Sequence, residues 1–190
     1  MREATELEST VLGVVWLRGP CTAYVVRQEF LASASAHWSG SAGAIYPLLA
    51  RLEKQGLIKA RESEWGRGSK KEFSITRRGM TALRNWIGPP LPEWTAQPTF
   101  DPVRTRLSFL GALAPEQRRE FVAEARRNLE SELTRLRALM AAVTTQADLY
   151  EYLSTLGTIH ELEGRRRWLE DVEKAVSQEP SPRLRGEGGA

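Results

Sequence analysis

The apolar positions of residues 1–56 follow the period of helices. Thr5 and Glu8 have the spacing of a capping box ahead of an apolar run, and Thr22 is placed to cap a second helix. A third helix is expected to end at Gly56, because glycine readily takes the left-handed conformation that closes a helix. Its predicted buried side has the i, i+3, i+4, i+7 spacing and consists of Ile45, Leu48, Leu49 and Leu52.

After Gly56 the apolar period changes from about 3.6 to about 2 residues, which is typical of strands. The apolar residues that alternate with polar ones are Ile58, Ala60, Phe73 and Ile75. A turn-rich stretch at residues 63–69 separates the two runs, so a β-hairpin is expected there. Thr76 is placed to cap a fourth helix, and the predicted order is therefore three helices, a hairpin and a helix.

Proline marks the boundary between the two halves of the chain. Residues 89–100 are rich in proline, which neither continues a helix nor pairs in the middle of a sheet. We therefore expect one domain at residues 1–88, a linker at 89–100 and a second domain at 101–178. Residues 179–190 are rich in Pro, Gly and Arg, and they are expected to form a disordered tail.

The second domain is expected to consist of helices. Asp101-Pro102 has the pattern of a cap followed by proline at the first helical position, and Pro115 begins a helix of about 28 residues. The apolar stripe of this helix is Val122, Leu129, Leu133, Leu136, Met140 and Val143. The last helix carries Leu149, Leu153, Leu156, Ile159, Leu162, Leu169, Val172 and Val176. Stripes of this length are too long to hide against the first domain alone, so a second copy of the chain is the natural cover.

Charged residues are distributed unevenly along the chain. The net charge is +3, and residues 1–90 hold 13 Lys/Arg against 8 Asp/Glu, whereas residues 91–190 hold 14 against 16. A positive first half suits a polyanionic partner. No apolar run approaches the roughly 20 residues that span a bilayer, and the N-terminus is acidic where a secretory signal is basic, so a cytoplasmic protein is expected. Cys21 is the single cysteine, which excludes an internal disulfide and a multi-cysteine zinc site.

Residues that could carry catalysis are sparse. His37 and His160 are the two histidines, and neither lies in an HExxH, GxSxG or P-loop pattern. Because no nucleophile and base can be paired from the sequence, we expect no enzyme activity, cofactor or metal. The basic run at residues 165–167 is surrounded by acidic residues at helical spacing, which favours a self-neutralised surface over a second nucleic-acid site.

The predicted elements describe a mainly helical protein with a small β-hairpin. Three short helices followed by a hairpin are typical of a winged helix-turn-helix, in which the third helix enters the major groove of DNA. Arg67, Lys70 and Lys71 lie at the hairpin tip, where they can meet phosphates. Lysines on a hairpin can also serve only to keep an edge strand solvated and to prevent it from pairing with another chain. A third possibility is that these cations face an acidic partner protein.

Residues 43–58 read GAIYPLLARLEKQGLI and resemble the signature of the PadR-like transcription regulators. The resemblance extends over residues 5–87. It implies a winged helix-turn-helix domain with long C-terminal helices, and a homodimer that binds an inverted-repeat operator of double-stranded DNA, usually as a repressor. A winged-helix protein-interaction subunit that does not bind DNA is the alternative.

The resemblance also implies a set of contact residues. It places Tyr24, Tyr46 and Arg51 on the DNA-facing side, and Ser41 at the helix start, where it can offer a hydroxyl to phosphate. Ala44 departs from the family pattern, which often has Ser or Thr at this position. Two alternatives remain, because Tyr46 could pack half-buried beside Trp38, and Arg51 could form a surface pair with Glu53 or Glu62.

Aromatic residues near the domain boundary suggest a site for a small molecule. Trp94, Phe100 and Trp168 are the candidates, and PadR-like regulators respond to phenolic or drug-like compounds. A flat aromatic effector that releases the protein from DNA is therefore one hypothesis. Plain core packing of these rings is the other.

Overall fold

The computed structural model describes residues 4–33, 35, 38, 41–65, 68–142 and 149–178. The chain divides into two compact units, unit 1 (residues 1–97) and unit 2 (residues 98–190), and each is described by itself. The division lies within the proline-rich stretch. Arg67 and the tail at residues 179–190 lie outside the described residues.

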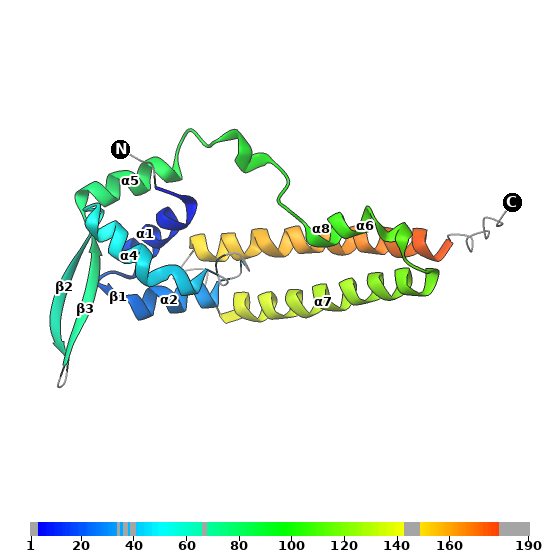
Figure 1. Cartoon of the computed structure of the whole chain (residues 1–190), viewed down its shortest axis with the longest axis horizontal. Coiled ribbons are helices and arrows are strands. Elements are labelled where there is room, and N and C mark those ends of the chain that lie inside the picture. The colour runs from blue at the N-terminus through cyan, green and yellow to red at the C-terminus, as the bar shows by residue number, and fades with distance from the viewer. Residues whose placement is uncertain are drawn as a thin grey trace, which may run out of the picture. The chain divides into compact units, whose positions relative to one another are not determined.

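Unit 1 combines short helices with a three-stranded antiparallel sheet of order β1-β3-β2 (Figure 1). Its elements are α1 (Glu6–Arg18), β1 (Cys21–Thr22), α2 (Ala23–Ala32), the 3-10 turn η1 (Ala42–Ala44), α4 (Ile45–Lys54), β2 (Ile58–Trp65), β3 (Gly68–Ile75), α5 (Arg77–Ile87) and the 3-10 turn η2 (Glu93–Ala96). The predicted helices and hairpin are therefore confirmed. Strands β2 and β3 pair from Ile58 with Ile75 to Trp65 with Gly68.

Local hydrogen bonds set the helix ends as the sequence predicts. The Thr5 hydroxyl accepts from the Glu8 N–H at 3.2 Å, and the Glu8 carboxylate accepts from the Thr5 N–H at 2.9 Å. The Thr76 hydroxyl accepts from the Gly79 N–H at 3.0 Å at the start of α5. At the end of α4, Gly56 has φ +71°, and the Leu57 N–H donates to the Leu52 carbonyl at 3.0 Å.

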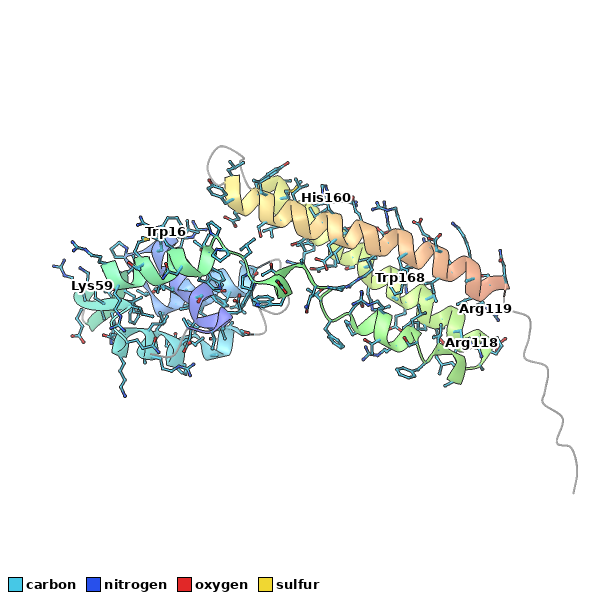
Figure 2. The ribbon with its side chains drawn as sticks, turned by 90° about the horizontal axis from the view of Figure 1, so that it is seen from above. Trp16, Lys59, Arg118, Arg119, His160 and Trp168 are labelled. Carbon is cyan, nitrogen blue, oxygen red and sulfur yellow. The ribbon has the colours of Figure 1, made fainter. Side chains whose placement is uncertain are left out.

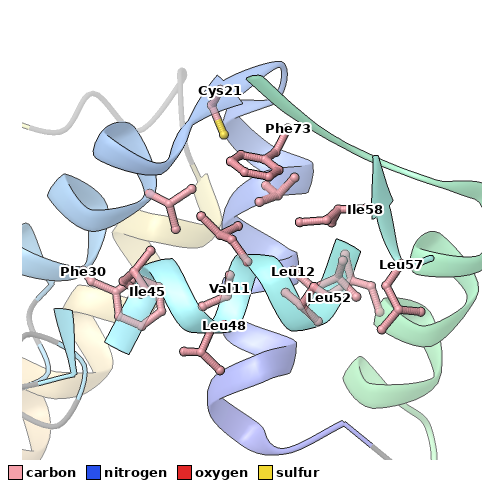
Figure 3. Close-up of a cluster of buried hydrophobic side chains, with 14 of the residues drawn as sticks. Val11, Leu12, Cys21, Phe30, Ile45, Leu48, Leu52, Leu57, Ile58 and Phe73 are labelled. Carbon is pink, nitrogen blue, oxygen red and sulfur yellow. The ribbon is translucent and has the colours of Figure 1, made fainter. Parts of the chain in front are cut away.

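The core of unit 1 lies between α1, α2, α4 and the sheet (Figure 3). It is built from Val11, Leu12, Val15, Cys21, Val26, Phe30, Ala42, Ile45, Leu48, Leu49, Leu52, Leu57, Ile58, Phe73 and Leu83. The whole predicted buried side of α4 belongs to this core. Burial of that side leaves the opposite side of the helix in solvent.

Two details of unit 1 differ from the sequence prediction. Strand β1 was not foreseen, because two residues carry no readable alternation and its pairing with β3 is long-range. Leu17 belongs to the apolar run that follows the capping box, from which a buried position is expected, yet it is 48% exposed. The buried side of α1 runs through Glu8, Val11, Leu12 and Val15, and Leu17 points away from it.

Unit 2 contains two short elements and two long helices (Figure 1). These are α6 (Pro102–Leu107), the 3-10 turn η3 (Leu110–Ala112), α7 (Pro115–Ala142) and α8 (Leu149–Gln178). The start of α6 and the 28-residue length of α7 are as predicted. The long helices pack against each other through a buried seam of Val122, Leu129, Leu133, Leu136, Ile159 and Leu169.

Ion pairs join the two long helices beside this seam. Arg126 pairs with Glu173, and Arg137 pairs with Glu163 at 2.9 Å.

The predicted apolar stripes of the long helices are only partly buried. Leu149 and Leu153 are about half exposed, and Val143 lies outside the described residues. Among the described residues, no helix is both long and apolar enough to cross a membrane.

Candidate nucleic-acid interface

Helix α4 and the η1 turn before it present a narrow exposed stripe on the side opposite the core. Gly43, Tyr46, Pro47, Ala50 and Lys54 are all exposed, and their spacing follows one face of the helix. Gly43 and Ala50 are small residues, and Pro47 has no backbone N–H that needs a partner. These three residues therefore let the helix backbone approach a flat or grooved partner closely. The major groove of DNA, about 12 Å wide, admits such a helix.

Tyr46 is the large side chain of the stripe, and it is 57% exposed. The alternative for Tyr46 is a half-buried position beside Trp38. Trp38 instead packs edge-on against Phe30, with 6.1 Å between ring centroids. More than half of the Tyr46 surface is open to solvent.

Tyr24 is also open to solvent. It lies in the first turn of α2 and is 62% exposed, so two tyrosines project from adjacent helices of unit 1. Ser41 precedes η1, and its hydroxyl makes no capping bond to that turn. Ala44 likewise gives α4 no side-chain cap. Neither Ser41 nor Ala44 therefore caps the backbone N–H groups in the first turns of η1 and α4 with its side chain.

Arg51 has a partner that the sequence analysis did not foresee. Its Nε lies 3.6 Å from Oε1 of Glu8, whereas pairing with Glu53 or Glu62 was expected as the alternative. The Arg51 side chain is 54% exposed, and that of Glu8 is 2% exposed. The guanidinium is thus steered by a buried acid of α1 while its outer edge remains accessible.

Two cations of β3 are engaged with acids. Lys70 Nζ lies 2.8 Å from Glu72, and Lys71 Nζ lies 2.8 Å from Glu53 at the end of α4. Lys71 also lies over the Phe73 ring, 5.5 Å from its centroid. The pair between Lys71 and Glu53 ties the hairpin to α4, so the hairpin and the helix form one surface.

Two further cations belong to the same region and were not among the predicted contacts. Lys54 ends the exposed stripe of α4, and Lys59 is exposed on β2 (Figure 2). Neither lysine forms an ion pair with another residue that the structure describes. The signal for Lys59 was already in the sequence, because Ile58 and Ala60 point inward and place Lys59 on the outer face of the strand.

The three predicted effector residues do not gather in one unit. Trp94 lies in unit 1, in η2, and is 53% exposed. Phe100 and Trp168 lie in unit 2, where Phe100 is 80% exposed. Trp168 lines a pocket of unit 2, and Phe100 is not among the residues that line it.

The described residues contain neither a cluster of metal ligands nor a reactive thiol. Within residues 4–33, 35, 38, 41–65, 68–142 and 149–178, no group of three His, Cys, Asp or Glu side chains could hold a metal ion. Burial raises the pKa of the Cys21 thiol, and the negative charges of Glu29 and Glu72 raise it further. Cys21 is therefore a protonated core residue at neutral pH rather than a nucleophile.

Comparison with known families assigns both units. The transcriptional regulator PadR-like family matches residues 11–85, which cover the core of unit 1, α4 and the hairpin. The C-terminal domain of virulence activator alpha matches residues 101–177, which cover α6 to α8. No curated protein matches the sequence.

Solved structures share the fold of the chain over nearly its whole length. Bacillus subtilis PadR in complex with operator DNA has 22% identity and a TM-score of 0.76, over 90% of this chain and 99% of that one. The same protein in complex with p-coumaric acid gives 22% identity and a TM-score of 0.73, with the same coverage. The Vibrio cholerae virulence activator AphA has 21% identity and a TM-score of 0.65, over 90% of this chain and 98% of that one.

The family assignment and the fold agree on unit 1, where the exposed face of α4, the two open tyrosines and the cationic hairpin lie. Residues 11–85 thus match the PadR-like family of transcriptional regulators, residues 101–177 match a regulator's C-terminal domain, and the two matches together span both units of the chain.

Proposed function

We propose that the chain binds specific sequences of duplex DNA by placing α4 in the major groove. The exposed stripe of α4 is the observation that carries this proposal. Tyr46 is its one large group, and small residues beside it allow the backbone to approach base edges. Tyr24 lies on α2 and Ser41 directly before η1, both beside α4, and Arg51 lies on α4 itself. All three would contact the sugar-phosphate backbone or the groove edge.

The hairpin would lie along the phosphates. For Lys70 and Lys71 to reach DNA, each must exchange its present carboxylate partner for a phosphate. Exposed ion pairs of this kind contribute only about 0–1 kcal/mol, so the exchange costs little compared with the release of condensed counterions. Arg67 at the hairpin tip would contribute a third contact of the same type.

Unit 2 would hold two copies together. A helical pair that buries one seam still leaves large apolar side chains in solvent, namely Phe100, Phe109, Leu149, Tyr150 and Leu153, which are 49–82% exposed. A second copy of the chain would cover such groups, as is usual in symmetric dimers. A fragment of residues 1–97, which has its own core, should be monomeric in sedimentation, whereas the full chain should be a dimer.

We further propose that the dimer represses transcription from an inverted-repeat operator. Bacillus subtilis PadR has been solved on operator DNA, and this chain shares its fold over 90% of its length. Two copies related by a two-fold axis read two half-sites in opposite orientation, so the operator would mirror that symmetry. We assign no catalytic step to the chain.

Selection of bound duplexes from a random pool tests the proposal directly. The full chain should enrich an inverted repeat and bind it with a steep dependence on salt, because each phosphate contact releases condensed counterions. Deletion of one half-site should then weaken binding strongly, since the two half-sites are linked only through the dimer. A pool that yields no motif, together with a flat salt dependence, would contradict the proposal.

One observation favours a different function. Because Lys70 and Lys71 are both engaged with acids, the hairpin could hold its fold together or meet an acidic protein rather than DNA. If the chain is a subunit that binds an acidic protein, it should enrich no sequence from the duplex pool. Removal of the hairpin cations should then leave any residual DNA affinity and its salt dependence unchanged.

Release from DNA by a small effector completes the proposal. Bacillus subtilis PadR has been solved with p-coumaric acid, which shows a small aromatic acid on a protein of the same fold. In this chain Trp168 is the predicted effector residue that lines a pocket. We expect a ligand of unit 2 to lower the affinity of the full chain for its operator, which a competition titration on labelled duplex would measure.

A further inference from the structure

Arg166 lies at the seam between α7 and α8, the two long helices that Figure 1 shows side by side. It follows Ile159 by seven residues and precedes Leu169 by three, so the helical period places it on the same side of α8 as these buried residues. Arginine is rarely buried without a partner, because its charge loses hydration in apolar surroundings. The position of Arg166 therefore requires an acceptor.

The matching arginine of α7 has an acceptor across the seam. Arg126 follows Val122 by four residues and precedes Leu129 by three, and both of these leucine and valine side chains are buried. Arg126 pairs with Glu173 on α8. An acid on the facing helix thus neutralises this arginine, and the seam holds it at no cost in unpaired charge.

The facing helix offers no such acid to Arg166. Because Arg126 pairs with Glu173 and Arg137 pairs with Glu163, residue numbers rise along α7 as they fall along α8, and the two helices are antiparallel. Arg166 lies between the two acids on α8, which places it opposite the stretch of α7 between the two arginines. The buried residues of that stretch are leucines, whose side chains cannot accept a hydrogen bond, namely Leu129, Leu133 and Leu136.

The Nε of Arg166 is left without an acceptor. It is shielded from solvent, and it donates to no group of the residues that the structure describes. Glu163 on the same helix already accepts from Nη2 of Arg137 at 2.9 Å. A shielded donor without an acceptor destabilises the state in which it occurs, and the penalty is larger for a charged group. A single pair of helices is therefore not the state to which Arg166 is suited.

One side of α8 remains available for a further contact. The side that faces α7 forms the seam, and the side that carries Gly164 and Trp168 lines a pocket with the segment before α6. A third side has apolar residues at the spacing i, i+4, i+7, and the first two are about half exposed. These residues are Leu149, Leu153 and Leu156. The same spacing continues to Arg167, directly beside Arg166.

We propose that a second copy of the chain packs along this third side of α8 and supplies a glutamate that accepts from Arg166. Arg166 is only partly buried, so a change of rotamer brings its guanidinium to the interface. In a two-fold interface the contact forms twice, and each chain satisfies the arginine of the other. The proposal rests on the dimer of the proposed function and names the contact that fixes its register, since apolar stripes alone allow the helices to slide.

The charge of unit 2 supports a second copy as the partner. Residues 91–190 hold 14 Lys/Arg against 16 Asp/Glu, so acids are in excess in this half of the chain. The long helices also carry glutamates that pair with no cation among the residues that the structure describes. These glutamates are Glu120, Glu124, Glu130, Glu161 and Glu170.

Replacement of each seam arginine tests the contact. Arg166→Met keeps the length of the side chain and removes its charge, so the dimer of the full chain should weaken at least about tenfold, because a charge-assisted hydrogen bond is lost at each symmetric contact. Arg126→Met is the matched control. Its acid lies in the same chain, so it should lower the Tm and change the dimer Kd by less than about threefold. Sedimentation velocity over a range of concentrations measures the Kd of both variants, after their helicity has been checked.

The opposite result for Arg166→Met would overturn the proposal. Loss of a buried charge that has no partner relieves its desolvation, so without an acceptor in the dimer the variant should dimerise as tightly as the original chain or more tightly. Equal weakening by both variants would show a general loss of packing, and it would also contradict a specific contact of Arg166.

Charge reversal identifies the acceptor. Arg166→Glu should form no homodimer, because two carboxylates would face each other at each contact. It should form a heterodimer with one of the chains in which Glu120, Glu124, Glu130, Glu161 or Glu170 is changed to arginine, since each contact then joins opposite charges. Native mass spectrometry of the mixtures detects this species. If none of the mixtures restores a dimer, or if Arg166→Glu forms homodimers like the original chain, the proposed contact does not exist.

These measurements are made without DNA, so they separate the contact from the proposed function. If the chain selects an operator as a dimer but Arg166→Met dimerises unchanged, the contact fails alone. If the chain selects no DNA sequence but Arg166→Met dissociates as expected, the regulator function fails and the contact stands.

Discussion

The Nε of Arg51 on α4 lies 3.6 Å from Oε1 of Glu8 on α1. The other oxygen of Glu8 accepts from the Thr5 N–H at 2.9 Å and closes the capping box. One nearly buried carboxylate thus caps the start of α1 and also orients a cation on α4, the helix proposed to enter the major groove. Because an oriented side chain loses less freedom on binding, the pair favours a specific contact by Arg51.

Arg51→Met should therefore separate recognition from stability. Arg51 is half exposed but Glu8 is nearly buried, so loss of the ion pair should lower the free energy of unfolding by about 1–3 kcal/mol, which leaves the protein folded. Operator affinity should fall about tenfold or more, because a charge-assisted contact is lost. Fluorescence polarisation and thermal unfolding measure the two effects. Arg84→Met, which removes an exposed cation from α5, is the matched control and should leave operator affinity nearly unchanged.

The hairpin should contribute affinity without sequence preference. Replacement of Arg67, Lys70 and Lys71 by alanine should weaken binding to operator and random duplex alike, and the salt slope should fall by up to about three units per protomer, at roughly 0.9 for each phosphate contact. Glu53→Gln should act in the opposite direction, because it releases Lys71 for DNA. An unchanged affinity and salt slope in the triple variant would favour the protein-interaction function.

Tyr46→Ala should reduce selectivity rather than general affinity. The ring is 57% exposed, so its removal should leave the protein folded and dimeric. If Tyr46 reads base edges, the change should cost about 1–3 kcal/mol at the operator and little on random duplex. Tyr46→Phe tells whether the hydroxyl or the ring is responsible. An equal loss on both duplexes would instead place Tyr46 on the phosphates.

Gly79 and Gly43 should respond in opposite ways to alanine. A Cβ at Gly79 would lie 2.0 Å from the Leu57 carbonyl oxygen, whereas a Cβ at Gly43 meets nothing within 4 Å. Gly79→Ala must displace the backbone that joins α4 to β2, so we expect a loss of several kcal/mol, as for severe overpacking. Gly43→Ala should change stability by less than about 1 kcal/mol. Urea unfolding of the two variants compares them directly, and equal midpoints would show that α5 does not pack on Leu57 as described.

Acid should weaken unit 2 through Glu163. A hydrogen bond from Arg137 lowers the pKa of this carboxyl below its ordinary value of 4.5, and the charges of Arg137, Arg166 and His160 act in the same direction. A lowered folded-state pKa gives stability that is present above the ordinary value and is lost as pH falls through the folded value. The difference in Tm between the original chain and Glu163→Gln should therefore be constant near neutral pH and shrink below about pH 4.5.

Arg137→Met supplies the control for this pH dependence. The Arg137 hydrogen bond is the largest cause of the lowered pKa, so Glu163→Gln made in that variant should have little further effect on the acid limb. A Tm difference that persists unchanged from neutral to acid pH would show that the interaction between the helices does not depend on the ionised carboxylate.

The sequence by itself determined the features that depend on neighbouring residues. Thr5, Thr76 and Gly56 were assigned to helix ends because their hydrogen bonds join groups within a few positions of each other. The buried side of α4 could be read for a similar reason, since the helical period places its members on one face. That period also places Tyr46 on the opposite face, but its exposure was established only by the structure.

Only the tertiary structure decided which distant groups meet. Arg51 with Glu8, Lys71 with Glu53, and Asp101 with Arg165 are pairs between separate elements, and the sequence offered closer acids for both Arg51 and Arg165. Exposed charges have many partners of similar energy, so packing of the elements makes the choice. The pocket beside Gly164 arose in the same way, because an empty volume depends on how α8 and the segment before α6 come together, and no local pattern encodes it.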